Sequence, residues 1–386
     1  MVVFMKLRRY RFLCAVFAVL LLCGTVCYAE EELPFTVEAK AAVLMEANTG
    51  KILYASNIDE PLPPASVTKI MTLLLTMEAI DSGKISWEDT VQVSENAASM
   101  GGSQVFLKPG ETMSVTDMVK SVVISSANDA AVALSEFVAG SEETFVSMMN
   151  ARAAELGMEH TSFENPTGLD DTVTNHTISA EDIAIMSREL VVKHPKILEY
   201  SSIWMDTIRD GAFGLSNTNR LIRFYHGANG LKTGSTSKAG FCISATAKRD
   251  GMQLIAVIMG SPNRDIRNEA AKKLLDYGFS TYSYVCFTEG NLEPVHVLGG
   301  ITDSCGLRYG KADFVLPKGS ASSVTQSVTV PEQISAPVQA GDVIGSISYM
   351  LNGEVLGSVE VTAAEDVPKI SYLGFFKRIL TRFFLN

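Results

Sequence analysis

The sequence predicts an α/β (α+β) fold with one antiparallel sheet and packed helices, followed by a small all-β domain and an amphipathic terminal helix. Strand patterns lie at both ends of a mostly helical stretch, which indicates that the first and last strands pair in one sheet. After about residue 282 the pattern changes to short alternating segments, which favours an all-β domain. Of the 386 residues, 47 % are hydrophobic and 19 % are charged, a composition that excludes intrinsic disorder.

The first 29 residues predict a signal peptide. A basic stretch, Lys6 to Arg11, precedes an apolar run over 12–22, and the small residues Cys27 and Ala29 precede the expected cut. A retained membrane anchor is the alternative, although the apolar run is shorter than the roughly 20 residues that a span needs. Both interpretations predict an exported protein.

Residues 37–280 are expected to form the α+β domain. One hairpin is predicted over 41–54, and a second over 240–259 with Asp250-Gly251 at its turn. Helical spacing and capping residues predict the helices between the hairpins. These helices are expected over 67–80, 115–124, 128–138, 142–156 and 180–192.

Residues 282–366 are expected to form the all-β domain. Alternating segments over 343–349 and 355–361 flank an Asn352-Gly353 turn, a strong hairpin signal. This region contains no evident reactive group of residues.

The terminal segment 368–386 predicts an amphipathic helix. Its apolar residues recur at helical spacing, and its cations occupy the other positions. The apolar set is Phe376, Ile379, Leu380 and Phe383, and the cations are Lys377, Arg378 and Arg382. Because aromatic residues and cations suit an anionic interface, we expect this helix on a membrane surface; a helix packed on the β domain is the alternative.

Charge and cysteine content limit the possible partners. The net charge is −11 although both ends of the chain are basic, so the body between them is strongly acidic and no nucleic-acid partner is expected. Beyond the signal peptide there remain Cys242, Cys286 and Cys305, an odd number without the spacing of a metal site. We interpret them as small buried hydrophobic residues, and a bridge between Cys286 and Cys305 stays open.

Several common catalytic signatures are absent from the sequence. It has no Gly-x-Ser-x-Gly, no His-Glu-x-x-His and no glycine-rich phosphate loop, and its five histidines have no evident serine or metal partner. We therefore interpret His160 and His176 as structural.

The sequence Ser66-Val-Thr-Lys69 opens an almost wholly apolar helix. Residues three apart on a helix share a face, so Ser66 Oγ and the Lys69 amine can meet. Burial lowers the pKa of a lysine, and a second cation nearby lowers it further, which produces an amine able to accept the proton of the serine. The same spacing recurs at Ser235 and Lys238, which do not begin a buried helix.

Two further motifs follow. Ser126-Ala-Asn128 lies at a junction of two helices, where a simple helix cap is the alternative interpretation. Lys232-Thr233-Gly234 precedes a strand, where a cation, a hydroxyl and a close backbone approach suit a carboxylate and an oxyanion; a basic turn is the alternative.

Together the three motifs resemble those of the low-molecular-mass penicillin-binding proteins of the D-alanyl-D-alanine carboxypeptidase family, peptidase family S11. The resemblance runs from about Val37 to Gly278 and includes 163–169 and 176–182. It implies the serine β-lactamase-like transpeptidase fold. The chain departs from the family at Pro63-Pro64 and at Ala127, and neither departure removes a reacting atom.

The resemblance implies an enzyme that removes the terminal D-alanine from peptidoglycan stem peptides, that β-lactam antibiotics inhibit, and that needs no metal or cofactor. It places the protein on the outer face of the bacterial cytoplasmic membrane. Ser66 would be the nucleophile, Lys69 its base and Ser126 a proton relay. The implied substrate-binding residues are Asn128, Lys232, Thr233, Gly234 and Ser235, the last of which also offers its backbone N–H to the oxyanion.

Two alternatives remain. A serine β-lactamase would add a glutamate four residues before an asparagine, to activate water. The chain offers only Asp171 at that spacing before Asn175, and we interpret Asp171 as a loop residue. A non-catalytic peptidoglycan-binding protein of the same fold is the second alternative.

Overall fold

The computed structural model describes residues 35–171 and 173–385, so the predicted signal peptide lies outside the described residues. A five-stranded antiparallel sheet organises the first domain, in the order β2-β1-β9-β8-β7. These strands are β1 (Ala41–Glu46), β2 (Ile52–Ser56), β7 (Ala228–Thr236), β8 (Gly240–Arg249) and β9 (Met252–Ser261).

The first strand of the sheet lies beside the last one along the chain. β1 pairs with β9 from Ala41 opposite Met259 to Glu46 opposite Leu254, which confirms the predicted pairing of the two ends of the domain. Both strands are buried along almost their whole length. Continuous apolar strands are typical of a sheet covered on both faces.

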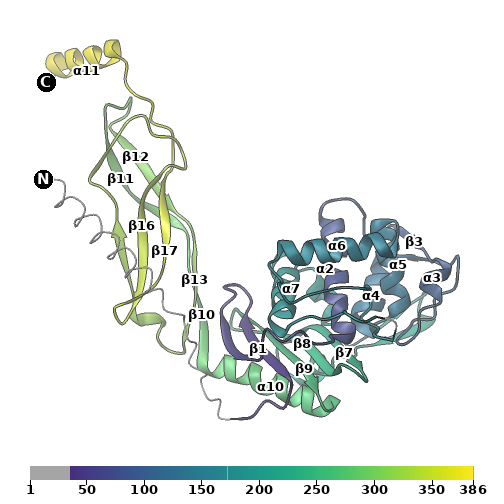
Figure 1. Ribbon diagram of the computed structural model, residues 1–386. Coiled ribbons are helices and arrows are strands. Elements are labelled where there is room, and N and C mark those ends of the chain that lie inside the picture. Colours follow the sequence, from purple (N-terminus) through teal and green to yellow (C-terminus); the bar gives the residue numbers. More distant parts are fainter. Residues whose placement is uncertain (1–34, 172, 386) are drawn as a thin grey trace, which may run out of the picture. The chain divides into compact units, whose positions relative to one another are not determined.

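Helices cover the two faces of this sheet (Figure 1). The five predicted helices are present, and they pack with the long helix α2 at their centre. They are η1 with α2 (Ala65–Thr68, Lys69–Asp81), α4 (Val115–Ser125), α5 (Asn128–Ala139), α6 (Glu142–Glu155) and α7 (Ala180–Lys193). The sequence analysis did not predict α10 (Arg264–Thr281), which covers the other face and begins at Asn263, whose side chain accepts hydrogen bonds from the N–H groups of Asp265 and Ile266.

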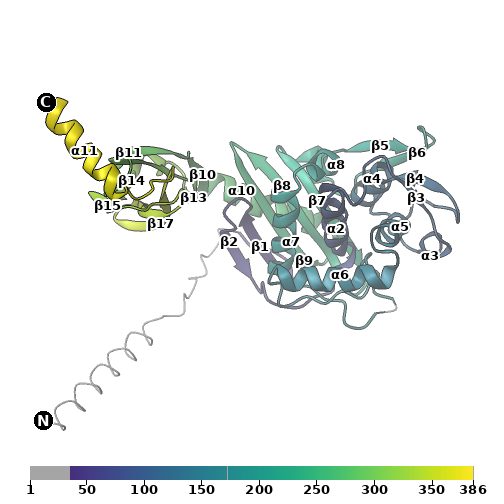
Figure 2. The ribbon, with the colours of Figure 1, turned by 90° about the horizontal axis from the view of Figure 1, so that it is seen from above.

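Short elements at the helical end of the domain were not predicted either. Figure 2 shows them there: an antiparallel ladder of β3 (Thr90–Gln92) with β4 (Thr112–Ser114), and a hairpin of β5 (Met205–Ile208) with β6 (Phe213–Ser216). Strands of three or four residues are too short to give a clear alternation. The remaining short helices are α3 (Glu95–Ala98), α8 (Ile197–Ser201) and α9 (Leu221–Phe224).

The second part of the chain is all-β, as predicted. It has a ladder of β10 and β13 and a six-stranded sheet in the order β14-β16-β17-β12-β11-β15. A 3₁₀ turn, Ala321–Ser323, lies between β13 and β14. The strands are β10 (Tyr282–Phe287), β11 (Gly290–Leu298), β12 (Ser304–Tyr309), β13 (Ala312–Pro317), β14 (Val324–Thr329), β15 (Gln333–Ser335), β16 (Val343–Leu351) and β17 (Glu354–Ala363).

The core of this domain contains a cluster of aromatic rings. Tyr349 is fully buried, with its ring centroid 4.8 Å from that of Phe287 and 5.2 Å from that of Phe314. Cys305 is buried on β12, as expected, but Cys286 is exposed on β10, so the expectation that all three cysteines are buried is wrong for it. Both are free thiols, so no bridge joins them.

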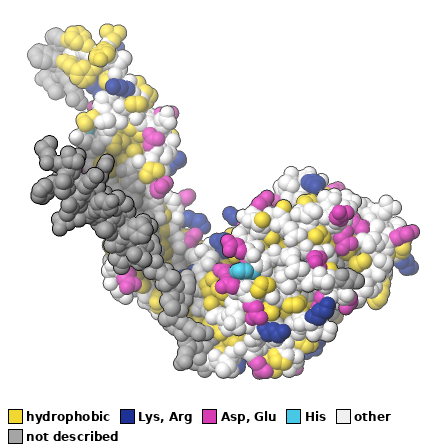
Figure 3. All heavy atoms as spheres, in the orientation of Figure 1, with side chains coloured by type: hydrophobic (Ala, Val, Ile, Leu, Met, Phe, Trp, Pro, Cys, Tyr) yellow, Lys and Arg dark blue, Asp and Glu magenta, His cyan; other side chains and the backbone are white. Residues whose placement is uncertain are grey.

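Helix α11 (Tyr372–Leu385) ends the described chain. Figure 3 shows hydrophobic side chains on its described part, and Phe376 and Ile379 are exposed. The guanidinium of Arg378 donates to Asp303 Oδ1 at 2.6 Å and to the carbonyls of Gly300 and Ile301, so this cation docks the helix on the β11–β12 loop. No helix in the described part of the chain is long and apolar enough to cross a membrane.

A close backbone approach at Gly168 gives a test of the packing around η1. Gly168 has φ +79°, and a Cβ there would lie 1.8 Å from the Ala65 carbonyl oxygen. We expect Gly168→Ala to cost more than about 4 kcal/mol of unfolding free energy, because backbone atoms must move. Thermal denaturation monitored by circular dichroism measures this loss.

Gly157→Ala is the matched control. Gly157 has φ +73° and open space around its added Cβ, so this variant carries the left-handed backbone cost of about 1–2 kcal/mol without the clash. Equal losses in the two variants would contradict the packing of Gly168 against η1.

Candidate active site

Ser66 and Lys69 meet at the start of α2. Ser66 lies in the 3₁₀ turn η1, and Lys69 is the first residue of the helix that follows it. Lys69 Nζ is 3.0 Å from Ser66 Oγ, 2.5 Å from Asn128 Oδ1 and 2.7 Å from the Thr167 carbonyl oxygen. The Lys69 side chain is fully buried, as the apolar helix predicted.

Burial makes Lys69 a base. The pKa of Lys69 lies well below the ordinary 10.5 because the ammonium is desolvated and because Lys232 repels it, while Asp129 acts in the opposite direction. A neutral amine has two N–H donors and one lone pair. The oxygens of Asn128 and Thr167 only accept, so they take both N–H groups, and the lone pair is left for the hydroxyl of Ser66.

Ser126 and Asn128 stand at the junction of α4 and α5. Ser126 ends α4 in a left-handed conformation, with φ 63°. Ala127 is the N-cap of α5, so neither Ser126 nor Asn128 is the N-cap that the sequence analysis gave as the alternative. Ser126 Oγ accepts a hydrogen bond from Lys232 Nζ at 2.8 Å. Asn128 Nδ2 donates to the Gly101 carbonyl at 2.7 Å, which fixes its Oδ1 toward Lys69.

The third motif, Lys232-Thr233-Gly234, lies on the edge strand β7. A Cβ at Gly234 would lie 2.8 Å from the Pro64 carbonyl oxygen and 2.9 Å from the Ser66 nitrogen, so the strand lies directly against η1 and only glycine fits. Lys232 is buried, and burial together with the nearby Arg267 lowers its pKa to about 7. Thr233 Oγ1 donates to Thr218 Oγ1 at 2.8 Å.

A cavity of about 670 Å³ opens beside these residues. Five of the eight predicted site residues line it, while Lys69, Asn128 and Lys232 lie behind this lining and contact it. The lining residues are Ser66, Ser103, Ser126, Trp204, Ser216, Asn217, Thr218, Arg220, Phe224, Thr233, Gly234, Ser235, Arg264 and Arg267.

The sequence analysis missed the arginines of this cavity. Arg267 is 3 % exposed, and burial lowers its pKa to about 10, so it remains a cation at neutral pH. It lies on α10, where Nη1 donates to the Cys242 carbonyl at 3.3 Å. Arg267 reaches the site only because α10 packs on the sheet, so no local sequence pattern could have identified it.

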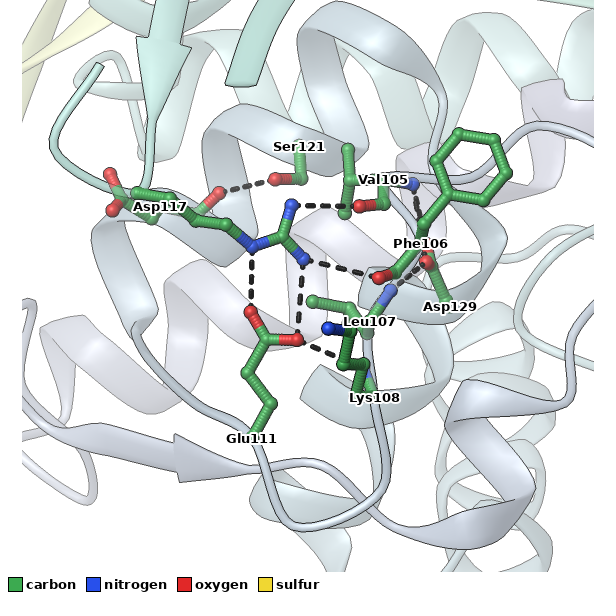
Figure 4. Close-up of polar contacts among 9 residues, drawn as sticks. Val105, Phe106, Leu107, Lys108, Glu111, Asp117, Ser121 and Asp129 are labelled. Carbon is green, nitrogen blue, oxygen red and sulfur yellow. Dashed lines mark hydrogen bonds and ion pairs between the residues drawn. The ribbon is translucent and has the colours of Figure 1, made fainter. Parts of the chain in front are cut away.

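One wall of the cavity is held by two charged side chains. Asp129 on α5 accepts from the N–H groups of Val105 and Leu107, which docks the loop that carries Ser103. Arg209, in the β5–β6 turn, donates to Glu111 and to the Val105 carbonyl at 2.7 and 2.9 Å. Figure 4 labels Asp129 with Val105 and Leu107, and Glu111 near them, and its dashed lines mark these hydrogen bonds.

His176 supports η1 from outside the cavity, in agreement with a structural role. Thr68 Oγ1 is 2.9 Å from the Ala65 carbonyl oxygen and 2.8 Å from His176 Nε2, and the N–H of Glu164 donates to His176 Nδ1. Burial lowers the pKa of His176 to about 4, so the ring is neutral. The network assigns the proton to Nε2, because Nδ1 accepts.

Comparison with known proteins adds independent findings. The chain matches a family model described as D-alanyl-D-alanine carboxypeptidase over residues 28–263, and one described as penicillin-binding protein 5, C-terminal domain, over 309–369. D-alanyl-D-alanine carboxypeptidase DacF of Bacillus subtilis is 45 % identical over 350 residues, which cover 89 % of each chain.

Solved structures agree with the predicted fold. Penicillin-binding protein 5 of Haemophilus influenzae is 33 % identical with a TM-score of 0.78, and the match covers 87 % of this chain and 99 % of that one. Penicillin-binding protein D2 of Listeria monocytogenes, solved with ampicillin bound, is 32 % identical with a TM-score of 0.59, over 64 % of this chain and 100 % of that one. These matches confirm the fold, and the chain belongs to the D-alanyl-D-alanine carboxypeptidase family.

Proposed function

We propose that the protein is a serine-type carboxypeptidase that removes the terminal D-alanine from peptidoglycan stem pentapeptides through an acyl-enzyme on Ser66. The observation that carries the proposal is the buried Lys69, whose pKa is lowered by desolvation and by Lys232 and whose Nζ lies 3.0 Å from Ser66 Oγ at the cavity. The family to which the chain belongs supports the same reaction. The matched structure that was solved with ampicillin bound supports β-lactams as ligands.

Acylation would begin when Ser66 Oγ attacks the carbonyl carbon of the penultimate D-alanine. The Oγ–H proton passes to Lys69 Nζ as the carbon–oxygen bond forms. The backbone N–H groups of Ser66 and Ser235 would stabilise the oxyanion, and the close packing of Gly234 on η1 places the two segments side by side.

The leaving D-alanine would take the hydroxyl proton of Ser126, and Lys232 Nζ would replace that proton through the hydrogen bond that it donates to Ser126 Oγ. Lys232 donates to Ser126 Oγ, so the hydroxyl hydrogen of Ser126 is free to point toward the leaving nitrogen. The terminal carboxylate would bind Thr233 and Arg267, which both line the cavity. Lys232 lies behind Ser126, so we propose that its charge attracts the substrate carboxylate without contacting it directly.

Water would then release the acyl group. Asp171 is exposed and does not line the cavity, which argues against a deacylating carboxylate of the β-lactamase kind. Without such a base, a factor of about 10² to 10⁴ in water attack is absent, and a penicillin adduct should be long-lived.

The location follows from both ends of the chain. The signal sequence over 1–29 would export the protein, and α11 would hold it on the outer face of the cytoplasmic membrane. Arg378 docks α11 on the β11–β12 loop, while Phe376, Ile379 and Leu380 stay exposed. An apolar helical face beside cations suits the surface of an anionic bilayer.

The nucleophile can be tested by covalent labelling. Ser66→Ala should abolish labelling by a fluorescent penicillin and reduce release of D-alanine from a pentapeptide by more than about 10³-fold, because the attacking oxygen is removed. Ser147→Ala, in an exposed turn of α6, is the control and should label like wild type. Labelling of the Ser66 variant, or a wild-type adduct that disappears within seconds, would overturn the assignment.

The pH dependence of acylation tests the base. The value of kcat/KM should rise with pH as Lys69 loses its proton, with a midpoint well below 10.5. It should fall again above about pH 7, as Lys232 loses the charge that favours the substrate carboxylate. The rising and falling limbs of this pH profile report Lys69 and Lys232 as an interacting pair. A rising limb centred near pH 10 would contradict an uncharged Lys69.

Truncation after Ser371 tests the membrane helix. This cut keeps Val367, which is fully buried in the β domain, and the hydrogen bond from the Ile370 N–H to the Gly299 carbonyl. The truncated mature protein should lose binding to anionic vesicles in a sedimentation assay and keep its activity on soluble peptides. Vesicle binding equal to that of the full mature chain would show that α11 is not the anchor.

A further inference from the structure

A buried carboxylate that the mechanism does not use, Asp170, contacts the strand end next to the proposed oxyanion donor. Asp170 is 8 % exposed and follows the loop residue Thr167 by three positions. Its Oδ2 accepts a hydrogen bond from the Oγ1 of Thr236 at 2.5 Å. Thr236 is the last residue of β7 and follows Ser235, whose backbone N–H would stabilise the oxyanion. Hydrogen bonds to a carboxylate are roughly twice as strong as those between neutral groups.

Lys238 adds a second connection between Asp170 and the turn that joins β7 to β8. Its Nζ donates to the Asp170 carbonyl at 2.6 Å, so in the second Ser-x-x-Lys sequence the lysine contacts this loop. The N–H of Ala239 donates to Thr236 Oγ1 at 3.0 Å, which closes the turn. Asp170 therefore binds the β7–β8 turn through both its side chain and its main chain.

The same loop also holds the base. The carbonyl of Thr167 accepts from Lys69 Nζ at 2.7 Å. The loop is braced by Asn165, whose side chain accepts from the N–H of Gly168 at 2.7 Å and donates to the Leu169 carbonyl at 2.8 Å. A segment braced in this way transmits a displacement along its length, so the carboxylate and the carbonyl that holds the base keep a fixed separation.

We propose that Asp170 is a positioning residue for acylation. Its carboxylate fixes the end of β7, and with it the Ser235 N–H, relative to the carbonyl that orients Lys69. The oxyanion donor and the base act in the same step, so the acylation rate depends on the separation between them. The inference rests on the proposed function and concerns its rate, and it adds no bond-making step to the acyl transfer.

Substitutions of Thr236 test this role. Thr236→Val removes the hydroxyl and nearly keeps the shape of the side chain. We expect its kcat/KM for the peptide diacetyl-L-Lys-D-Ala-D-Ala to fall about 10- to 100-fold, because a misplacement of about 1 Å can cost 10²-fold. Thr236→Ser restores the hydroxyl and should recover most of that loss. Asp171→Asn, at the exposed neighbour of Asp170, is the matched control and should leave kcat/KM unchanged.

A transition-state analogue separates positioning from stability. Diacetyl-L-Lys joined to the boronic acid analogue of D-alanine would form a tetrahedral adduct with Ser66, with one oxygen in the place of the oxyanion. Its inhibition constant should rise in Thr236→Val by the same factor by which kcat/KM falls. A role in stability alone would lower the fraction of protein that fluorescent penicillin labels and leave the inhibition constant of the remaining enzyme unchanged.

Two further variants address the carboxylate and the second connection. Asp170→Ala removes the acceptor, and combining it with Thr236→Val should cost little more than either change alone, because both remove one hydrogen bond. Lys238→Met, at an exposed position, removes the contact with the Asp170 carbonyl. It should lower kcat/KM less than Thr236→Val and raise the inhibition constant of the boronic acid in proportion, and it serves as the test if Thr236→Val does not fold.

The outcomes separate the two proposals. A folded Thr236→Val variant with wild-type kcat/KM, or one that loses kcat/KM without a rise in the inhibition constant, overturns the role of Asp170 while the carboxypeptidase stands. Additive losses in the double variant, or a Lys238→Met variant that equals wild type where Thr236→Val does not fold, overturn that role as well. Absence of labelling and of D-alanine release in wild type overturns the proposed function itself.

Discussion

The site depends on one buried amine, Lys69, whose charged form is disfavoured inside the protein. Lys69 is buried between two oxygens that only accept, Asn128 Oδ1 and the Thr167 carbonyl. A charged ammonium there would lose its hydration and face the field of Lys232, so the neutral form is favoured. The fold must therefore bring α5 and the 163–169 loop to the start of α2, and the helix cluster of the first domain does this.

Each partner of that amine is held by a further contact. Asn128 is oriented by the Gly101 carbonyl, and the loop that supplies it is docked by Asp129 and Arg209. Gly168 follows Thr167 and touches the Ala65 carbonyl, where a side chain would collide. The nucleophile turn, the loop and β7 therefore form one packed unit, in which a small displacement of one segment is felt by the others.

Much of this arrangement could be predicted from the sequence. The motif residues Ser66, Lys69 and Lys232 were found because a local pattern carries them, and the main hairpins because their apolar runs and turns are clear. Arg267 and Trp204 were missed because only tertiary packing brings α10 and the segment between α8 and β5 to the cavity. The left-handed conformation of Ser126 is likewise set by its neighbours, since a sequence of small polar residues suits a cap equally well.

The pairing of β1 with β9 has a consequence for folding. Residues 41–46 form hydrogen bonds with partners more than two hundred positions further along the chain, so the contact order of the domain is high. Proteins of high contact order fold slowly, because a long loop must close before its contacts stabilise anything. A growing chain cannot complete the central sheet until residue 261 has emerged, and until then β1 lacks one of its two neighbours. The edge strand β7, which carries Lys232 to Ser235, is connected to β1 only through β8 and β9, so this side of the site is completed only when the central sheet closes.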